Sequence, residues 1–405
     1  MNIVIVGHVD HGKSTFIGRL LYDTKSLPES VVEEVTKLCN EFGKELKFAY
    51  FLDSFEEERS QNITIDTSQI FFKTDKRDYV IIDAPGHVEF VKNMITGASQ
   101  ADAAILIVDI DEGMQEQTKR HAYILSLLGL KQVIVVINKM DKIDYGEQRF
   151  NNFKTEVLDF LNRLHIKPSY VIPISAKKGD NIASKSEEMA WYNDLSVLGS
   201  LDVFNTKESL VDKPLRFPIQ DVYKISDKRI LVGTIESGEI EFGDEVVFLP
   251  SGKKTVVKSV EKWNEDKKNA GAGESIGVTL QDPLFIERGE VICGSNSDIP
   301  EVKDTFTANV FWMSPKSINV NEKITLRSTT QEIDCVIDNI NTKINSSSLE
   351  KLGENCESLR ETEVGTVIIK TSNPIVIENF NKSKGLGRFV LVKDEDVVAG
   401  GIILE

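Results

Sequence analysis

The 405-residue sequence lacks the features of a membrane-bound, secreted or disulfide-stabilised protein. It has no run of 18 or more apolar residues, which argues against a membrane-spanning helix. Only four cysteines occur and none stand at C-x-x-C spacing, so we predict neither a zinc site nor a disulfide framework. The first residues read as a buried strand without a basic start or cleavage site. We therefore expect no signal peptide and a cytoplasmic location.

Basic residues are also in short supply. The chain has 48 Lys and Arg against 64 Asp and Glu, which gives a formal net charge of −16. A protein that grips nucleic acid through a broad basic face carries the opposite excess. We therefore do not expect nucleic acid as a partner, although a local basic patch is compatible with this composition.

Short apolar runs alternate with helical patterns over the first 200 residues. Uninterrupted β-branched runs of this kind are typical of parallel strands that are buried on both faces. Helical segments between them form βαβ units, so we predict a doubly wound, mostly parallel α/β domain over residues 1–208. The predicted strands cover residues 2–6, 79–83, 103–109, 132–138 and 170–174.

The pattern changes near residue 205 to short alternating strands separated by turn signals such as Glu236-Ser237-Gly238. Strands spaced this closely predict antiparallel barrels or sandwiches. A polar segment that ends at Pro300 indicates a boundary. We therefore predict one antiparallel β-barrel domain over residues 209–299 and a second over residues 300–405.

The strongest motif spans residues 7–14 and fits G-x-x-x-x-G-K-[ST], directly after a predicted strand and before a predicted helix. Its glycines let backbone N–H groups close around a β-phosphate, and the helix N-terminus adds a positive dipole end. Lys13 should neutralise β- and γ-phosphate oxygens, and Ser14 should ligate Mg²⁺. The expected nucleotide contacts in this loop are Gly7, His8, Val9, Asp10, His11, Gly12, Lys13, Ser14 and Thr15.

A second motif, Asp83-Ala84-Pro85-Gly86-His87, ends another predicted strand. Asp83 can hold Mg²⁺ through water, and Gly86 can offer its N–H to the γ-phosphate without a Cβ in the way. His87 would orient the attacking water, because positioning dominates phosphoryl transfer. Thr64 could complete the Mg²⁺ shell with GTP bound and let go after hydrolysis. Pro85 lies within the same nucleotide contact, and the residues expected to act in hydrolysis are His87, Lys13, Thr64 and Gly86.

A third motif, Asn138-Lys139-Met140-Asp141, selects the base. The Asp141 carboxylate can accept from both N1–H and the exocyclic amine of guanine, whereas adenine would leave a buried charge unpaired. Lys139 can lay its stem over the base, and the backbone of Ser175-Ala176-Lys177 can meet the guanine O6. Because these signals follow successive strand ends, at the crevice where such sheets bind ligands, we predict that the chain binds GTP and GDP.

Residues 7–15 together with 83–87 resemble the translation-factor class of GTPases, and the likeness extends over essentially the whole chain. The resemblance implies a GTPase domain followed by two barrels, with His87 as the catalytic histidine. It also implies that Val9 and Ile63 form an apolar gate beside that histidine.

Two families of this class compete. One is elongation factor Tu with its eukaryotic and archaeal counterpart, which carries aminoacyl-tRNA to the ribosome. The other is the GTPase subunit of heterodimeric ATP sulfurylase, which residues 16–24, 175–182 and 215–223 resemble more closely. The second resemblance implies that GTP hydrolysis is coupled to formation of adenylylsulfate and pyrophosphate from ATP and sulfate. It also implies a heterodimer with the sulfate adenylyltransferase catalytic (small) subunit.

No histidine follows His165, so a His-x-x-His motif for sulfate adenylation cannot lie in the barrels. That chemistry would therefore belong to the partner. We favour the sulfurylase interpretation, with the carrier of aminoacyl-tRNA and a stand-alone regulatory GTPase as alternatives.

Overall fold

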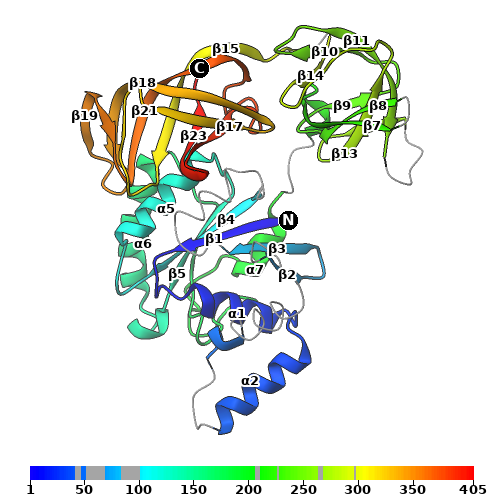
Figure 1. Ribbon diagram of the computed structural model, residues 1–405. Coiled ribbons are helices and arrows are strands. Elements are labelled where there is room, and N and C mark those ends of the chain that lie inside the picture. The colour runs from blue at the N-terminus through cyan, green and yellow to red at the C-terminus, as the bar shows by residue number, and fades with distance from the viewer. Residues whose placement is uncertain are drawn as a thin grey trace. The chain divides into compact units, whose positions relative to one another are not determined.

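The chain forms two compact units, one built mostly from the N-terminal half and the other mostly from residues after Thr206. A computed structural model describes residues 1–41, 47–51, 69–83, 101–205, 210–225, 228–262, 268–295 and 298–405 (Figure 1). Within these ranges no helix is long and apolar enough to cross a membrane.

The N-terminal unit is built on a six-stranded sheet. Its strands are β1 (Asn2–Gly7), β2 (Gln69–Lys73), β3 (Asp78–Asp83), β4 (Ala103–Asp109), β5 (Val133–Asn138) and β6 (Tyr170–Pro173). They lie in the order β2-β3-β1-β4-β5-β6. Strand β2 is antiparallel to β3, whereas the other neighbours pair in parallel. The predicted mostly parallel sheet is therefore confirmed, and β2 is a strand that the sequence patterns did not indicate.

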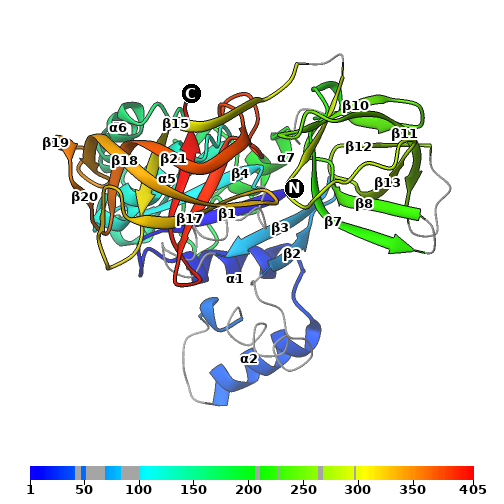
Figure 2. The same ribbon diagram turned by 45° about the horizontal axis from the view of Figure 1, so that its top comes forward.

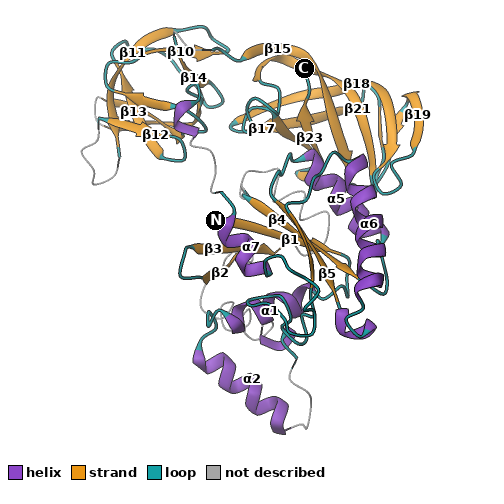
Figure 3. Cartoon of the chain, turned by 180° about the vertical axis from the view of Figure 1, so that it is seen from behind, coloured by secondary structure: helices purple, strands orange, loops and turns teal. Residues whose placement is uncertain are grey.

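Helices cover both faces of this sheet (Figure 3). The helices of this unit are α1 (Lys13–Asp23), α2 (Glu29–Glu41), α5 (Glu116–Leu127), α6 (Glu147–Arg163) and α7 (Val197–Val203), with a 3₁₀ turn at Met140–Ile143. Helix α2 extends beyond α1 and does not lie over the sheet (Figure 3). Apolar side chains of α1 and α7 pack with Ile3, Ile5 and Ile105 in one core cluster. Strand β4 is buried at every position, as its uninterrupted aliphatic sequence requires. This two-sided burial fixes the strand ends that carry the motif residues.

Antiparallel strands make up the second unit, after a short 3₁₀ turn at Leu210–Asp212. The strands of its first part are β7 (Phe217–Ile225), β8 (Lys228–Thr234), β9 (Glu239–Glu241), β10 (Glu245–Leu249), β11 (Lys254–Glu261), β12 (Asn269–Gly271), β13 (Ser275–Leu280) and β14 (Val291–Gly294). Six of them close into a barrel in the order β10-β11-β13-β8-β7-β14, in which Figure 2 shows β7 beside β8. The predicted turn at Ser237-Gly238 is present, and Gly238 adopts a left-handed φ of 77°.

The remaining strands form a seven-stranded sheet and a separate two-stranded sheet. They are β15 (Glu301–Trp312), β16 (Ile318–Asn319), β17 (Lys323–Ser328), β18 (Gln331–Asn345), β19 (Lys351–Cys356), β20 (Ser358–Leu359), β21 (Glu363–Ile377), β22 (Arg388–Lys393) and β23 (Asp396–Ile403). The order in the seven-stranded sheet is β17-β22-β23-β15-β21-β18-β19, and β17 also pairs with β18, which closes this sheet on itself. Strands β16 and β20 pair with each other. Two barrels after an α/β domain confirm the predicted fold class. The residue limits predicted for the domains stay a prediction.

A buried ion pair joins distant parts of the second unit. Arg216, just before β7, donates from Nε to Glu378 Oε2 at 3.0 Å and from Nη2 to Oε1 at 2.7 Å. Its guanidinium also donates to the carbonyl oxygens of Asp298 at 2.8 Å and Leu215 at 2.9 Å. Both charged side chains are almost fully buried. Burial acts to lower the pKa of Arg216, but the Glu378 carboxylate outweighs it and the pKa is raised. The cation is therefore retained within the core.

Candidate nucleotide-binding site

The carboxyl ends of the parallel strands meet at one edge of the sheet. Gly7, at the end of β1, is the register partner of Ile107 in β4. Asp109, at the end of β4, is the register partner of Asn138 at the end of β5. Ser175 follows β6 by two residues. The phosphate-loop motif and the base-selecting motif are thus brought to the same edge, where open α/β sheets bind ligands.

Two glycines allow the phosphate loop to approach its neighbours. Gly12 adopts a left-handed φ of 91°, and a Cβ there would lie 2.5 Å from Nδ2 of Asn138. At Gly7 a Cβ would lie 2.4 Å from the carbonyl oxygen of Ile107. Both positions therefore require glycine, as the motif implies.

The N-terminus of α1 has the features of an anion-binding site. Gly12 caps this helix without a side-chain hydrogen bond, and its first turn contains no acidic residue. Lys13 Nζ donates to the carbonyl oxygens of Gly7 at 2.7 Å and His8 at 3.2 Å, which keeps the ammonium at the loop. Ser14 is exposed and Thr15 is partly buried. Uncapped N–H groups, a positive dipole end and a lysine are the features that bind phosphate, so these residues fit a nucleotide.

Asn138 holds three loops together. Its Nδ2 donates to the His11 carbonyl at 2.9 Å, which ties β5 to the phosphate loop. Its Oδ1 accepts from the backbone N–H of Lys139 at 2.7 Å and of Ala176 at 3.0 Å. The side chain is almost fully buried, so these bonds are protected from water. The motif residue Asn138 therefore fixes the geometry of the crevice from within the protein.

The carboxylate of Asp141 is oriented by a buried serine. Ser175 Oγ donates to Asp141 Oδ1 at 2.7 Å, and the N–H of Gly179 donates to the Ser175 carbonyl at 2.8 Å. Lys177, between them, is exposed. One carboxylate oxygen is thus bound by protein, which fixes the direction in which the other faces.

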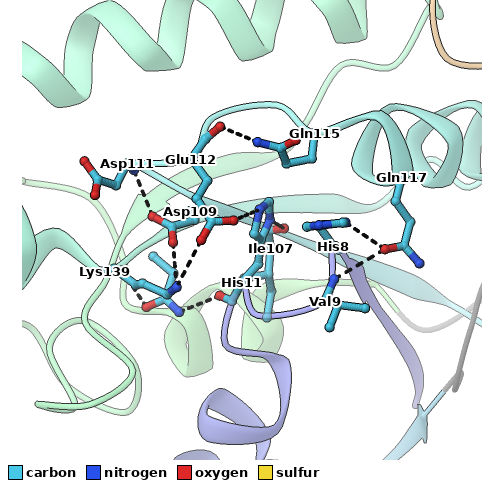
Figure 4. Close-up of polar contacts among 12 residues, drawn as sticks. His8, Val9, His11, Ile107, Asp109, Asp111, Glu112, Gln115, Gln117 and Lys139 are labelled. Atoms are coloured by element: carbon cyan, nitrogen blue, oxygen red, sulfur yellow. Dashed lines mark hydrogen bonds and ion pairs between the residues drawn. The ribbon is translucent and has the colours of Figure 1, made fainter.

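Lys139 forms an ion pair that the sequence patterns did not indicate. Its Nζ lies 2.6 Å from Oδ2 of Asp109, whose side chain is fully buried, while Asp109 Oδ1 accepts from the Asp111 backbone N–H at 2.8 Å (Figure 4). Burial acts to raise the pKa of Asp109, but the bonds from Lys139 and Asp111 outweigh it and hold the pKa below its usual value. A signal was present in the sequence, since Asp109 ends an otherwise aliphatic strand.

The two histidines of the phosphate loop contact the segment after β4. His11 is fully buried, with Nδ1 3.4 Å from the Ile107 carbonyl and Nε2 3.5 Å from Glu112 Oε2 (Figure 4). Burial lowers the pKa of His11 despite that carbonyl and the nearby acids. His8 Nδ1 lies 2.8 Å from Oε1 of Gln117. Glu112 and Gln117 therefore support the loop, and no motif pointed to either.

Several predicted site residues are either exposed or outside the described part of the site. Val9 is 59% exposed and Asp10 is exposed with a left-handed φ of 65°. Asp83 ends β3 beside β1, but its side chain is not among those described. The predicted residues Ile63, Thr64, Pro85, Gly86 and His87 lie outside the described residues.

Comparisons with known proteins agree with this architecture. Residues 1–235 match the elongation factor Tu GTP binding domain, residues 228–293 match elongation factor Tu domain 2, and residues 305–404 match the GTP-eEF1A C-terminal domain-like family. Elongation factor 1-alpha of Pyrococcus furiosus is 40% identical over all of this chain and 97% of its own length. That of Archaeoglobus fulgidus is 39% identical over 100% and 97%, respectively. A solved structure of sup35 complexed with GDP covers this chain fully and 93% of its own, at 23% identity and a TM-score of 0.46, too distant to bear on function.

These relatives overturn the sulfurylase interpretation. The predicted coupling to sulfate adenylation, the heterodimer with a sulfate adenylyltransferase subunit and the absence of a nucleic-acid partner are wrong, because the full-length relatives are elongation factors. The physical reason lies in where the misleading stretches fall. Residues 16–24 supply core side chains of α1, and residues 215–223 supply the core of the first barrel. Such residues report a shared scaffold rather than a partner.

The net charge of −16 gave no sound basis for predicting the partner, since a whole-chain sum does not describe any one surface.

The matched family models together span nearly the whole chain, and the full-length relatives agree with them. This chain belongs to the elongation factor Tu and elongation factor 1-alpha family of GTP-binding translation-factor GTPases.

Proposed function

We propose that this chain is a cytoplasmic elongation factor of the 1-alpha type, which holds aminoacyl-tRNA while GTP is bound and releases it after hydrolysis. The observation that carries the proposal is the 40% identity to an elongation factor 1-alpha over the whole chain and 97% of that relative. Such an even match supports the same domain set, and hence the same division between a nucleotide switch and a binding surface.

We assign the GTP contacts to the residues at the sheet edge. Lys13 and the N–H groups at the start of α1 neutralise the phosphates. Asp141, oriented by Ser175, accepts from the guanine N1–H and exocyclic amine, and the backbone of Ser175-Ala176-Lys177 faces the guanine O6. The Ala176 N–H donates to Asn138 Oδ1 at 3.0 Å, which supports this assignment because it holds the segment at the sheet edge.

Magnesium is the metal that the expected donors fit. Hydroxyl and carboxylate oxygens suit this hard cation, and the exposed Ser14 in the first turn of α1 is available to it. We propose Ser14, Thr64 and Asp83 as the residues that hold it. Within the described residues, no group of three or more His, Cys, Asp or Glu could hold a metal. When bound, magnesium would supply charge neutralisation at the phosphates.

The domain limits are proposed as 1–208, 209–299 and 300–405. The matches to the two barrel families, at 228–293 and 305–404, each fall inside one proposed barrel. The match to the GTP binding domain continues to residue 235, beyond the first limit.

We propose His87, assisted by Gly86 and Thr64, for the hydrolysis step. His87→Ala should keep GTP affinity and lose most of the hydrolysis rate, about a hundredfold or more, because the attacking water is no longer oriented. Single-turnover hydrolysis at saturating GTP measures this, and His165→Ala is the control outside the motif. Hydrolysis near the unmodified rate in His87→Ala would show that the proposed role is wrong.

Aminoacyl-tRNA binding tests the proposed function itself. With a non-hydrolysable GTP analogue, the full chain should slow spontaneous hydrolysis of the aminoacyl ester, because the bound ester is shielded from water. With GDP the protection should fall by about tenfold or more, since a switch requires differential affinity between its two states. Uncharged tRNA should compete weakly. Equal protection with both nucleotides, or none with either, would contradict the proposal.

A further inference from the structure

The lysine of the base-selecting motif is anchored by an acid from the neighbouring strand. In the parallel pair β4–β5, Asp109 is the register partner of Asn138, and Asn138 directly precedes Lys139. Its Oδ2 lies 2.6 Å from Lys139 Nζ, which is closer than the 4.0 Å between that ammonium and Glu112 or the 3.8 Å between Asp109 and Lys142. Asp109 is therefore the principal partner of Lys139 in this cluster (Figure 4).

Packing does not explain an acid at this position. Residues 103–108 of β4 are aliphatic and buried, and Asp109 is equally buried at the end of that strand. A buried carboxylate is costly unless it is paired and hydrogen-bonded. Here both requirements are met, by the Lys139 ammonium on one oxygen and the Asp111 N–H on the other. The buried Asp109 carboxylate therefore depends on Lys139 for its charge partner.

The backbone conformation of Lys139 and its ion pair together restrict the path of the lysine side chain. Lys139 has a left-handed φ of 67° and a side chain that is 22% exposed, between the buried Asn138 and the Asp141 loop. Because the ammonium is held on the protein side, the apolar stem keeps one path at the edge of the crevice. A lysine without this anchor would sample many rotamers, and binding a base would have to order them.

We infer that Asp109 is a positioning residue for guanine-nucleotide binding, which holds the Lys139 ammonium so that the lysine stem is already placed against the base. This inference rests on the proposed function, in particular on guanine lying beside Asp141 and Lys139. Asp109 does not contact the nucleotide, and its effect is transmitted through Lys139. The base is common to GTP and GDP, so affinity for both nucleotides should depend on Asp109 to the same extent.

Nucleotide titrations of the full-length protein test this inference. Asp109→Asn should weaken GDP and GTP binding by about tenfold each, while hydrolysis per bound GTP stays unchanged at saturation. The KM for GTP should therefore rise without a change in kcat. Asp111→Asn is the matched control, because it removes a neighbouring carboxylate whose side chain pairs with Arg149 at the surface. It should bind GDP like the unmodified protein.

A double-mutant cycle separates positioning from general damage. In a Lys139→Ala background, Asp109→Asn should cause no further loss of GDP affinity, because there is no stem left to place. Asp109→Val, which continues the aliphatic strand, provides a second variant if the amide impairs folding, and the same loss is expected. Retention of GDP affinity within twofold in a folded Asp109 variant, or an equal loss with and without Lys139, would overturn the inference.

The outcomes also distinguish this inference from the proposed function. If the unmodified protein shows no preference for GDP over ADP, the guanine site itself is wrong. If the unmodified protein prefers GDP and the Asp109 variants bind it equally well, only the positioning role of Asp109 fails.

Discussion

Asp141→Asn is expected to weaken GDP binding by about a thousandfold. The variant should bind XDP with an affinity within about tenfold of the unmodified protein's affinity for GDP. Ser175 Oγ donates to Oδ1 of Asp141, and an asparagine oxygen can keep that bond. The amide nitrogen would then face the base. It would oppose the two donors of guanine, whereas xanthine offers a carbonyl at that position. Unpaired donors in a buried contact make the loss large.

Equilibrium titration of GDP and XDP against both proteins measures this exchange. Asp144→Asn is a matched control, because it makes the same chemical change three residues later at an exposed position with a left-handed φ of 49° that asparagine tolerates. The control should bind GDP normally. If Asp141→Asn kept GDP affinity within threefold and gained none for XDP, Asp141 would not read the base.

Arg216→Met is expected to lower the free energy of unfolding of the second unit by about 3–5 kcal/mol. The change leaves Glu378 buried without its cation, and it removes donors from the carbonyl oxygens of Asp298 and Leu215. Replacing Glu378 by methionine as well should restore much of the loss, because no buried charge remains. The shift in denaturant midpoint, followed on the full-length protein, measures both effects.

Arg327→Met provides the control for the ion pair. Arg327 lies 3.0 Å from Glu332, but both side chains are about half exposed, so the expected cost is about 0–1 kcal/mol. Equal shifts for Arg216→Met and Arg327→Met would show that burial does not amplify the Arg216–Glu378 interaction.

The nucleotide domain was accessible to sequence reasoning because its signals are local. A strand buried on both faces must be continuously aliphatic, and the predicted run over 103–109 coincides with β4. The glycine at position 12 follows from a loop that must approach Asn138 closely. Strand β2 was missed because Gln69–Lys73 is a short, half-buried edge strand, with Phe71 exposed between buried Ile70 and Phe72.

Contacts between distant residues could not be predicted in this way. The pairing of Arg216 with Glu378 spans 162 positions, and nothing near either residue specifies the other. Asp109 and Lys139 meet only because β4 and β5 are neighbours in parallel register. The partner was wrong for a different reason. The resemblance rested on core stretches of α1 and the first barrel and on residues 175–182 at the candidate nucleotide site, and none of these describes a partner surface.

The central claim is that guanine nucleotides bind at the carboxyl ends of β1, β4, β5 and β6. The nucleotide preference of the unmodified protein tests it most directly, because no substitution is needed. GDP should bind most tightly, IDP about tenfold more weakly since it lacks the exocyclic amine, and ADP more weakly than GDP by about a thousandfold. ADP binding within about tenfold of GDP would contradict a guanine site that is read by the Asp141 carboxylate.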